Sequence, residues 1–202
     1  MNYSTIAAAV EHYRARGYAY VQDAPWNVGA AAYYATKPKD AKDVVIMDES
    51  VYGEGFPTKG YLVASGEQSF VQMMLDGQPL KRAVCVTPCF RIEQYNVWHR
   101  PYFMKVELIN AHDVDDGHLL HMVHEACSFF EGFLPHVRIV KTGVGYDIIE
   151  KDSRMELGSY GIRDMIVVNQ RLRWIYGTGC AEPRLSTVIE RFRRDRASGS
   201  ID

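Results

Sequence analysis

Residues 89–103 combine side-chain types that can hold a nucleotide. Cys-Phe-Arg-Ile-Glu at residues 89–93 is followed by a loop and by His-Arg-Pro-Tyr-Phe at residues 99–103. Since successive side chains alternate along a strand, Arg91 and Glu93 share one face. Arg91 would bind a phosphate, Glu93 would accept a hydrogen bond from the base, and Phe103 would stack on its ring. A cross-strand ion pair on a solvated sheet face explains the same residues equally well.

A second candidate segment reads Gly-Thr-Gly-Cys-Ala-Glu-Pro-Arg at residues 177–184. Alternate small residues such as Gly177 and Gly179 let a ligand approach the backbone closely. Arg184 falls in the first turn of an expected helix, where its charge opposes the helix dipole unless an anion lies between them. The segment is therefore a candidate phosphate site, and a plain strand-to-helix turn is the simpler alternative.

Length and composition are those of one globular domain, residues 1–202, with 47% hydrophobic and 24% charged residues. No apolar run approaches the ~20 residues that span a bilayer, and the N-terminus does not resemble a secretory signal. Four scattered cysteines without a C-x-x-C pair favour a reducing cytoplasm. The net charge of −2 is unusual for a protein that lives on a polyanion. The basic cluster at residues 191–196 is interpreted as a solvated helix face.

Hydrophobic periodicity and turn residues predict the elements that position these segments. We expect helices at 4–16, in the first half of 28–42, and at 67–75, 116–131 and 184–196. Strands are expected at 18–22, 44–47, 61–64, 83–93, 103–110, 137–141, 144–150, 153–159, 164–168 and 172–176. Ser4 is the expected N-cap of the first helix, residues 83–110 form a long antiparallel hairpin, and the tail 197–202 is frayed. The sum is an α+β fold, a mostly antiparallel sheet flanked by helices.

Three histidines, His118, His121 and His124, recur every three residues on the helix expected at 116–131. This spacing allows a metal site. The apolar residues on the same helix, among them Leu119 and Val123, favour a helix that covers the sheet instead.

Taken in order, these segments resemble class II aminoacyl-tRNA synthetases from about residue 5 to residue 195. Residues 90–103 resemble the family's second motif, F-R-x-E, a loop and R/H-x-x-x-F, and residues 177–184 have the spacing of its third. The first motif is a helix followed by a strand that ends in proline, and residues 11–25 are similar to it. The resemblance implies that family's catalytic core and a homodimer through residues 5–25.

The resemblance also implies roles for the candidate residues in binding ATP. Arg91 would bind the α-phosphate and the reacting carboxylate, and Glu93 and Phe103 would hold the adenine. Arg184 would stack on the other face of the adenine and reach the γ-phosphate. Further residues would contact the phosphates or the Mg²⁺ ion: His99, Arg100, Gly177 and Gly179 for the nucleotide, and Glu156 or Glu107 for the metal.

Two features concern the substrate. Residues 62–68 resemble the loop that binds the substrate's amino group in several members, with Glu67 pairing with the ammonium and Ser65 and Gln68 beside it. A helix N-cap at Ser65 is the equal alternative. Residues 156–163 also resemble the aspartyl and asparaginyl branch, in which the arginine matching Arg163 meets the substrate side chain. A structural arginine accounts for Arg163 equally well.

Two departures from the third motif bear on function. Ala181 replaces a glycine, and Pro183 replaces the acid that precedes the arginine. The catalytic elements use nearly the whole chain, so we expect no separate anticodon-binding domain. The first hypothesis is ATP-dependent activation of an amino acid or related carboxylate, with transfer to an acceptor other than a full tRNA. The alternatives are a minimal synthetase charging tRNA and a non-catalytic paralogue acting as a regulatory or assembly subunit. Neither the carboxylate nor the acceptor is identified.

Overall fold

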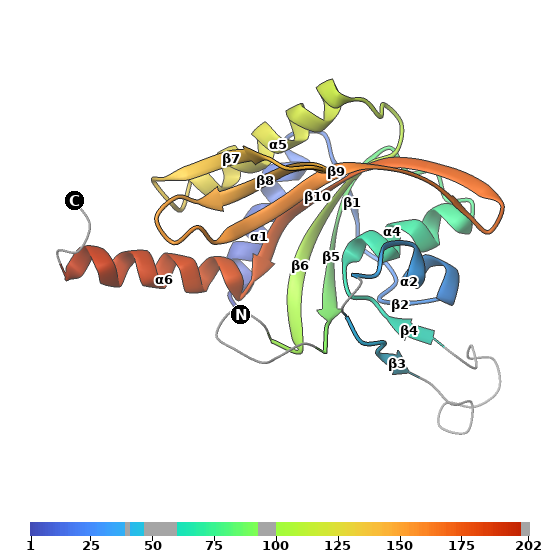
Figure 1. Ribbon diagram of the computed structural model, residues 1–202, viewed down its shortest axis with the longest axis horizontal. Coiled ribbons are helices and arrows are strands. Elements are labelled where there is room, and N and C mark those ends of the chain that lie inside the picture. Colours follow the sequence, from blue (N-terminus) through green and yellow to red (C-terminus); the bar gives the residue numbers. More distant parts are fainter. Residues whose placement is uncertain (39–40, 47–59, 93–99, 199–202) are drawn as a thin grey trace.

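A seven-stranded sheet forms the centre of the protein. The computed structural model describes residues 1–38, 41–46, 60–92 and 100–198. The sheet order is β1-β5-β6-β10-β9-β8-β7, antiparallel except where β1 pairs with β5 (Figure 1). The strands are β1 (Ala19–Val21), β5 (Arg82–Phe90), β6 (Tyr102–Asn110), β7 (Val137–Lys141), β8 (Gly145–Glu150), β9 (Glu156–Val167) and β10 (Gln170–Glu182). A small antiparallel sheet adds β2 (Asn27–Val28), β3 (Val45–Ile46) and β4 (Gly60–Leu62). The expected mostly antiparallel α+β fold is confirmed.

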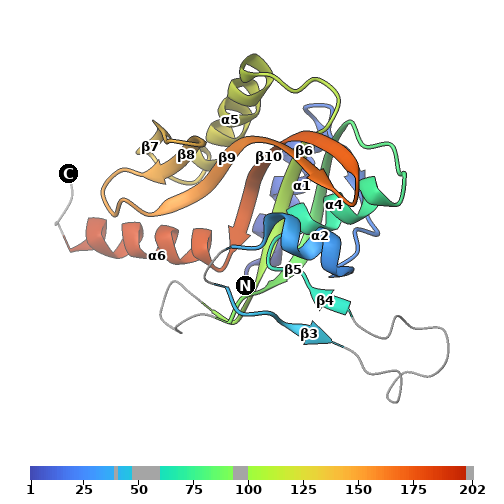
Figure 2. The same cartoon turned by 45° about the vertical axis from the view of Figure 1, so that its right-hand side comes forward.

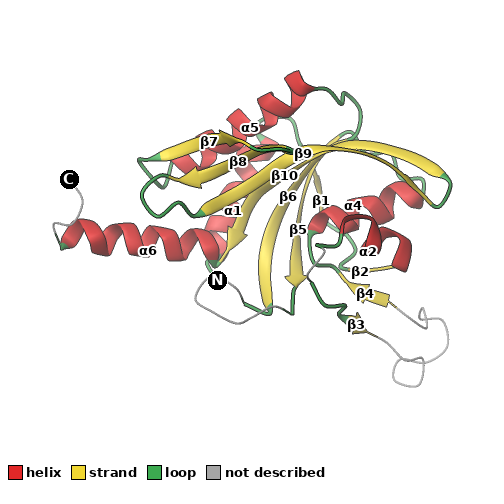
Figure 3. Ribbon diagram, viewed as in Figure 1, coloured by secondary structure: helices red, strands yellow, loops and turns green. Residues whose placement is uncertain are grey.

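Alternating side chains on the central strands build two cores on opposite faces of the sheet. Val84, Leu108 and Ile175 join a core with α1 (Tyr3–Arg14), α5 (Asp116–Glu131) and α6 (Arg184–Ala197). Their neighbours Ile109 and Trp174 join a second core with α2 (Ala30–Thr36) and α4 (Gly66–Leu75). Helices therefore cover both faces of the sheet (Figure 3). The helices α2 and α4 cover only part of theirs, which leaves room there for a site.

The N-cap of α5 is the one predicted from the sequence, whereas the N-cap of α1 is a different residue from the one predicted. The Asp115 carboxylate accepts a hydrogen bond from the backbone N–H of His118, and α5 begins at Asp116 as expected. The N-cap of α1 is Asn2, whose side-chain oxygen accepts from the N–H groups of Ser4 and Thr5 at 3.1 and 3.3 Å. The prediction of Ser4 as the cap was wrong, because asparagine two residues earlier is an equally good cap and starts the helix sooner.

The histidines of α5 make separate contacts. His118 lies against Asp115, and His121 lies 3.1 Å from Glu125. No cluster of three metal-ligating side chains occurs in the described part of the chain. Leu119 and Val123 are buried against the sheet, as the amphipathic interpretation predicts. Within the described ranges, no helix is long and apolar enough to cross a membrane.

Two long strands replace the three short ones expected between residues 153 and 176. Strands β9 and β10 pair along their length and join through a turn in which Val168 and Asn169 have positive φ. Gly161 lies inside β9, where a Cβ would come within 2.7 Å of the Tyr176 hydroxyl. A glycine required by close packing does not interrupt a strand. The resulting hairpin extends over α2 and α4 (Figure 2).

Candidate active site

A cavity of about 570 Å³ opens on the face of the sheet that α2 and α4 leave partly uncovered. Strands β6, β9 and β10 form its floor, and the ends of α2, α4 and α6 form its walls. Segments far apart in sequence therefore meet in one place. Nine of the predicted site residues line it: Ser65, Glu67, Arg91, Arg100, Phe103, Glu107, Glu156, Arg163 and Arg184.

Arg91 and Phe103 lie together on one side of the cavity. Arg91 directly follows β5, and its Nε donates a hydrogen bond of 2.9 Å to the carbonyl of Ala64. Its guanidinium carbon lies 5.2 Å from the centroid of the Phe103 ring. This bond through Nε orients the arginine, and its two terminal nitrogens make no hydrogen bond to a described residue. A guanidinium held in this way can bind a phosphate or carboxylate through two parallel hydrogen bonds.

Arg184 is the first residue of α6, and its guanidinium pairs with a carboxylate of the protein itself. Its Nη1 lies 3.3 Å from both the carbonyl and the carboxylate Oε1 of Glu156, the first residue of β9. This carboxylate offsets the unfavourable position of a cation at a helix N-terminus. The Glu156 side chain is 48% exposed, so the pair is weak and can open to a ligand.

The inner end of the cavity, defined by Ser65, Glu67, Lys105, Glu107 and Arg163, holds two ion pairs. Lys105 lies 2.9 Å from Glu107, which is 1% exposed, and Ser65 donates a 2.6 Å hydrogen bond to the same carboxylate. Glu67 accepts from Arg163 Nε at 3.3 Å and from the indole N–H of Trp174 at 2.9 Å. Burial raises the pKa of the Glu67 carboxyl, against the opposing attraction of Arg163. Ser65 occupies the N-cap position of α4, yet its hydroxyl bonds to Glu107 rather than capping the helix.

Three predicted residues lie outside the cavity lining. The buried Gln68 side chain accepts from the Ala64 N–H and donates to the Tyr33 carbonyl, so it holds the loop before α4 in place. Gly177 and Gly179 face the helices on the other side of the sheet, where added Cβ atoms would lie 2.6 Å from Tyr160 and 2.7 Å from Tyr13. The space that these glycines leave is filled by protein. The remaining two predicted residues, Glu93 and His99, fall outside the described residues.

Several residues that line the cavity were not predicted from the sequence. They are Lys37, Lys105, Ser159, Tyr176, Thr178 and Glu182. Lys105 could have been predicted from the alternation of side chains along β6, because it lies midway between Phe103 and Glu107 and therefore on the same face. Glu182 carried no such signal: it is fully buried and accepts from the Asn2 N–H and the Ser186 hydroxyl.

The charges of the cavity fit ATP. Six lysine or arginine and four glutamate side chains line it among the described residues, so it is net positive in a chain of net charge −2. Arg91, Arg100 and Arg184 are suited to phosphates, and Phe103 offers an aromatic face for a base. Glu156 fits Mg²⁺, which needs only one or two carboxylates when phosphates supply other ligands. Glu107 does not fit this role, because Ser65 and Lys105 already occupy its oxygens.

Solved structures share this fold. A pyrrolysyl-tRNA synthetase from Desulfitobacterium hafniense matches with a TM-score of 0.65 and 15% identity over 93% of this chain and 66% of its own. Another pyrrolysyl-tRNA synthetase structure from the same organism gives 0.64 and 16%, over 93% and 68%. The cytoplasmic serine-tRNA ligase of Naegleria fowleri, in complex with AMP, gives 0.63 and 14%, over 88% and 50%.

The likeness is one of structure. No model of a protein family matches the sequence, and no curated protein matches it. The chain spans about two thirds of the length of the first structure and half of the third. At these identities the comparison establishes the architecture alone. The protein has the fold of a class II aminoacyl-tRNA synthetase catalytic domain.

Proposed function

We propose that the protein uses ATP to activate an amino acid or related carboxylate as its adenylate and transfers it to an acceptor other than a full tRNA. One observation carries the proposal: a single cavity brings together Arg91, Phe103 and Arg184, the residues to which the motifs assign ATP binding. Arg91 directly follows β5, Phe103 lies in β6 and Arg184 begins α6, so only the folded chain brings them together. Shared architecture with synthetases, one of them solved with AMP, supports the proposal.

The chemistry requires charge neutralisation and alignment. A carboxylate that attacks the α-phosphorus brings two anions together, and an arginine can hold both through bidentate hydrogen bonds. Arg91 has that role here, with Arg100 and Arg184 on the remaining phosphates. No general base is needed, because the attacking carboxylate is already ionised. When bound at Glu156, Mg²⁺ would offset the charge of the pyrophosphate.

Departures from the third motif do not remove Arg184 from the site. Although Pro183 precedes it, Arg184 lines the cavity and reaches Glu156. Glu182, the glutamate that directly precedes Pro183, is buried and bonds to Asn2 and Ser186. The position of Arg184 in the cavity supports a catalytic protein over a non-catalytic paralogue.

The test is amino-acid-dependent exchange of pyrophosphate into ATP, measured across the proteinogenic amino acids and simple carboxylic acids. We expect exchange with one substrate or a small group of them. Arg91→Ala should lower the exchange rate by about 100-fold, the scale for removing one transition-state donor. Arg193→Ala is the matched control, since Arg193 is exposed on α6 and does not line the cavity. Exchange that survives Arg91→Ala would refute the site assignment.

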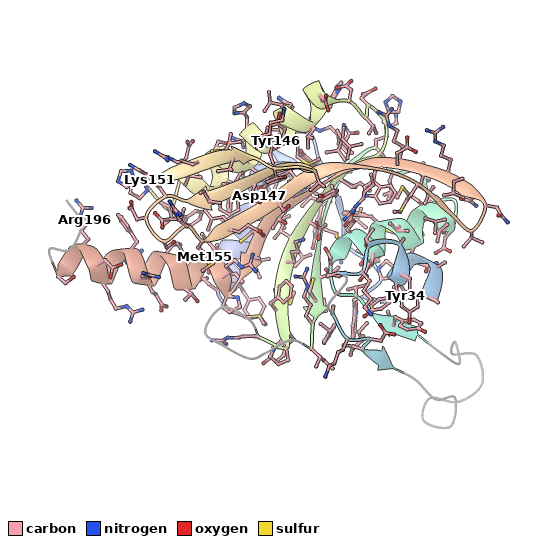
Figure 4. All side chains as sticks on the ribbon, viewed as in Figure 1. Tyr34, Tyr146, Asp147, Lys151, Met155 and Arg196 are labelled. Atoms are coloured by element: carbon pink, nitrogen blue, oxygen red, sulfur yellow. The ribbon has the colours of Figure 1, made fainter. Side chains whose placement is uncertain are left out.

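The proposal for the acceptor rests on where the basic side chains of the protein lie. The exposed arginines of residues 191–196 lie toward the far end of α6, and Figure 4 shows Arg196 on the opposite side of the molecule from Tyr34 of α2. The first residue of α6, Arg184, lines the cavity, whereas the arginines of the cluster do not line it and lie toward the other end of that helix. A small amine, a carrier-protein thiol or a metabolite is therefore the proposed acceptor. Charging of a tRNA added to the exchange assay would favour the minimal synthetase instead.

A homodimer through residues 5–25 is part of the proposal. Strand β1 is at the edge of the sheet, and Tyr20 within it and Trp26 after it are 42% and 49% exposed. Exposed aromatic residues at a sheet edge are suited to an interface. Sedimentation equilibrium should give twice the mass of the chain, and a monomer at micromolar concentration would contradict the assignment.

A further inference from the structure

The N-termini of two helices meet at the buried carboxylate of Glu182, the last residue of β10. Its Oε2 accepts a hydrogen bond of 3.3 Å from the backbone N–H of Asn2, the N-cap of α1. Its Oε1 accepts one of 2.9 Å from the hydroxyl of Ser186, in the first turn of α6. Figure 1 and Figure 2 both show the N-terminus of the chain beside the start of α6. One side chain therefore joins two helices whose first turns lie at opposite ends of the sequence.

This carboxylate supplies what the cap of α6 lacks. The N-cap of α6 is Pro183, whose side chain makes no capping hydrogen bond. Unpaired N–H groups give the N-terminus of a helix a partial positive charge, and two such ends share Glu182. Arg184 adds a full positive charge in the first turn of α6. A negative charge at this place stabilises the start of both helices and the arginine between them.

The backbone and the guanidinium of Arg184 are held in different ways. Glu182 lies two residues before Arg184, so its hydrogen bonds fix the point at which α6 begins. Although Glu182 borders the cavity, it is fully buried and both of its oxygens bond within the protein. The guanidinium contacts the partly exposed Glu156 carboxylate, a weak pair that a ligand can replace. The helix can therefore stay in place while the Arg184 side chain turns to a phosphate.

We infer that Glu182 is a positioning residue for Arg184: it holds the start of α6 against the start of α1 and thereby places the arginine in the nucleotide site. This rests on the proposed use of ATP. It also explains how the site tolerates Pro183, whose side chain offers no acceptor to the first turn of the helix.

The test is a double-mutant cycle on the Kd for Mg·ATP, measured by calorimetry on the folded protein. Glu182→Ala should raise this Kd by about 10-fold, within the range for residues that act through one another. Glu182→Gln keeps hydrogen-bonding atoms for Asn2 and Ser186 but lacks the charge, so it should raise the Kd by about 3-fold. The glutamine variant decides the test if the alanine variant does not fold. With Arg184→Ala already present, either change should alter the Kd by less than about 2-fold, because the arginine that Glu182 positions is gone.

Glu125→Ala is the matched control. Glu125 is also a buried carboxylate that joins distant segments, through Tyr18 and Arg82, and it does not line the cavity. Its loss should destabilise the chain and leave the Kd for Mg·ATP unchanged within about 2-fold. A role of Glu182 in stability alone would give the same result as this control.

The outcomes separate the inference from the proposed function. A loss of affinity on changing Glu182 that is equally large with and without Arg184 would overturn the inference, as would no loss in the wild-type background. Wild-type protein that binds Mg·ATP but exchanges no pyrophosphate with any acid would overturn adenylation, and the cycle would still decide the role of Glu182. Absence of Mg·ATP binding would overturn both.

Discussion

Glu67 offers a test of whether the inner end sacrifices stability for function. Its carboxylate is 5% exposed and accepts hydrogen bonds from the Trp174 indole and from Arg163. Glu67→Leu fills similar space but removes the acceptor. The fully buried indole N–H of Trp174 then has no partner, which costs about 2 kcal/mol in the free energy of unfolding. The Arg163 pair adds little, since that side chain is over a third exposed. For a chain of this size, 2 kcal/mol lowers the Tm by about 4–8 °C.

Glu67→Gln keeps an acceptor for the indole and removes the charge, so pH decides its effect. Burial raises the pKa of Glu67 in the folded state, so the folded protein binds more protons than the unfolded chain between the two pKa values. The contribution of this carboxyl to stability is therefore fully present below the unfolded pKa of about 4.3 and is lost as pH rises through the folded pKa. The glutamine variant has no such loss.

Urea unfolding of wild type and Glu67→Gln, from pH 4 to pH 8, measures the difference directly. We expect the variant to gain stability relative to wild type as pH rises, while its exchange activity falls because Glu67 lies in the site. The opposite trend, with wild type gaining on the variant, would show that attraction to Arg163 outweighs burial. It would refute the idea that the charge is retained at a cost.

Three further predictions concern packing and reactivity away from the reacting groups. Glu125→Ala should lower the free energy of unfolding by about 3 kcal/mol, measured in urea, because the buried carboxylate accepts from Arg82 and from the Tyr18 hydroxyl. Gly179→Ala should cost about 1–3 kcal/mol, since its Cβ would lie 2.7 Å from Tyr13, whereas Gly143→Ala, with open space around it, should be neutral within about 0.5 kcal/mol. All four cysteines are buried and burial raises their pKa values, so iodoacetamide at pH 8 should label none rapidly by mass spectrometry unless the chain unfolds.

The sequence predicted elements well where one periodicity dominates. The helix expected at 116–131 and the strand expected at 137–141 have those bounds, and the hairpin of residues 83–110 is β5 and β6. Each has an apolar pattern that is satisfied by a single face. The hairpin of β9 and β10 was expected as three short strands, and Gly158 and Gly161 both lie within β9. These glycines allow tyrosine side chains to approach the strand closely, a tertiary feature that no local sequence pattern indicates.

The candidate site was predictable to the extent that motif spacing fixes position. Arg91, Phe103 and Arg184 could be selected together because each motif places its residue on a known element. The pairing of Arg163 with Glu67 joins residues 96 positions apart, so neither spacing nor propensity indicates it. Gln68, selected by proximity to Glu67, points to the backbone on the other side, because helical neighbours at successive positions do not face the same way.

Net charge illustrates why whole-chain composition is a poor guide to a site. A value of −2 argues against a surface that tracks a polyanion, and the lining of the cavity is nonetheless net positive. The two facts agree once distance is considered: charges beyond a Debye length of about 8 Å are screened, so a bound triphosphate responds to the arginines that touch it. The same locality applies at the inner end. Lys105 and Arg163 each pair with a buried carboxylate, so a substrate at this end contacts positive and negative side chains in turn. Selectivity between substrates then depends on which of them places opposite charges against these side chains.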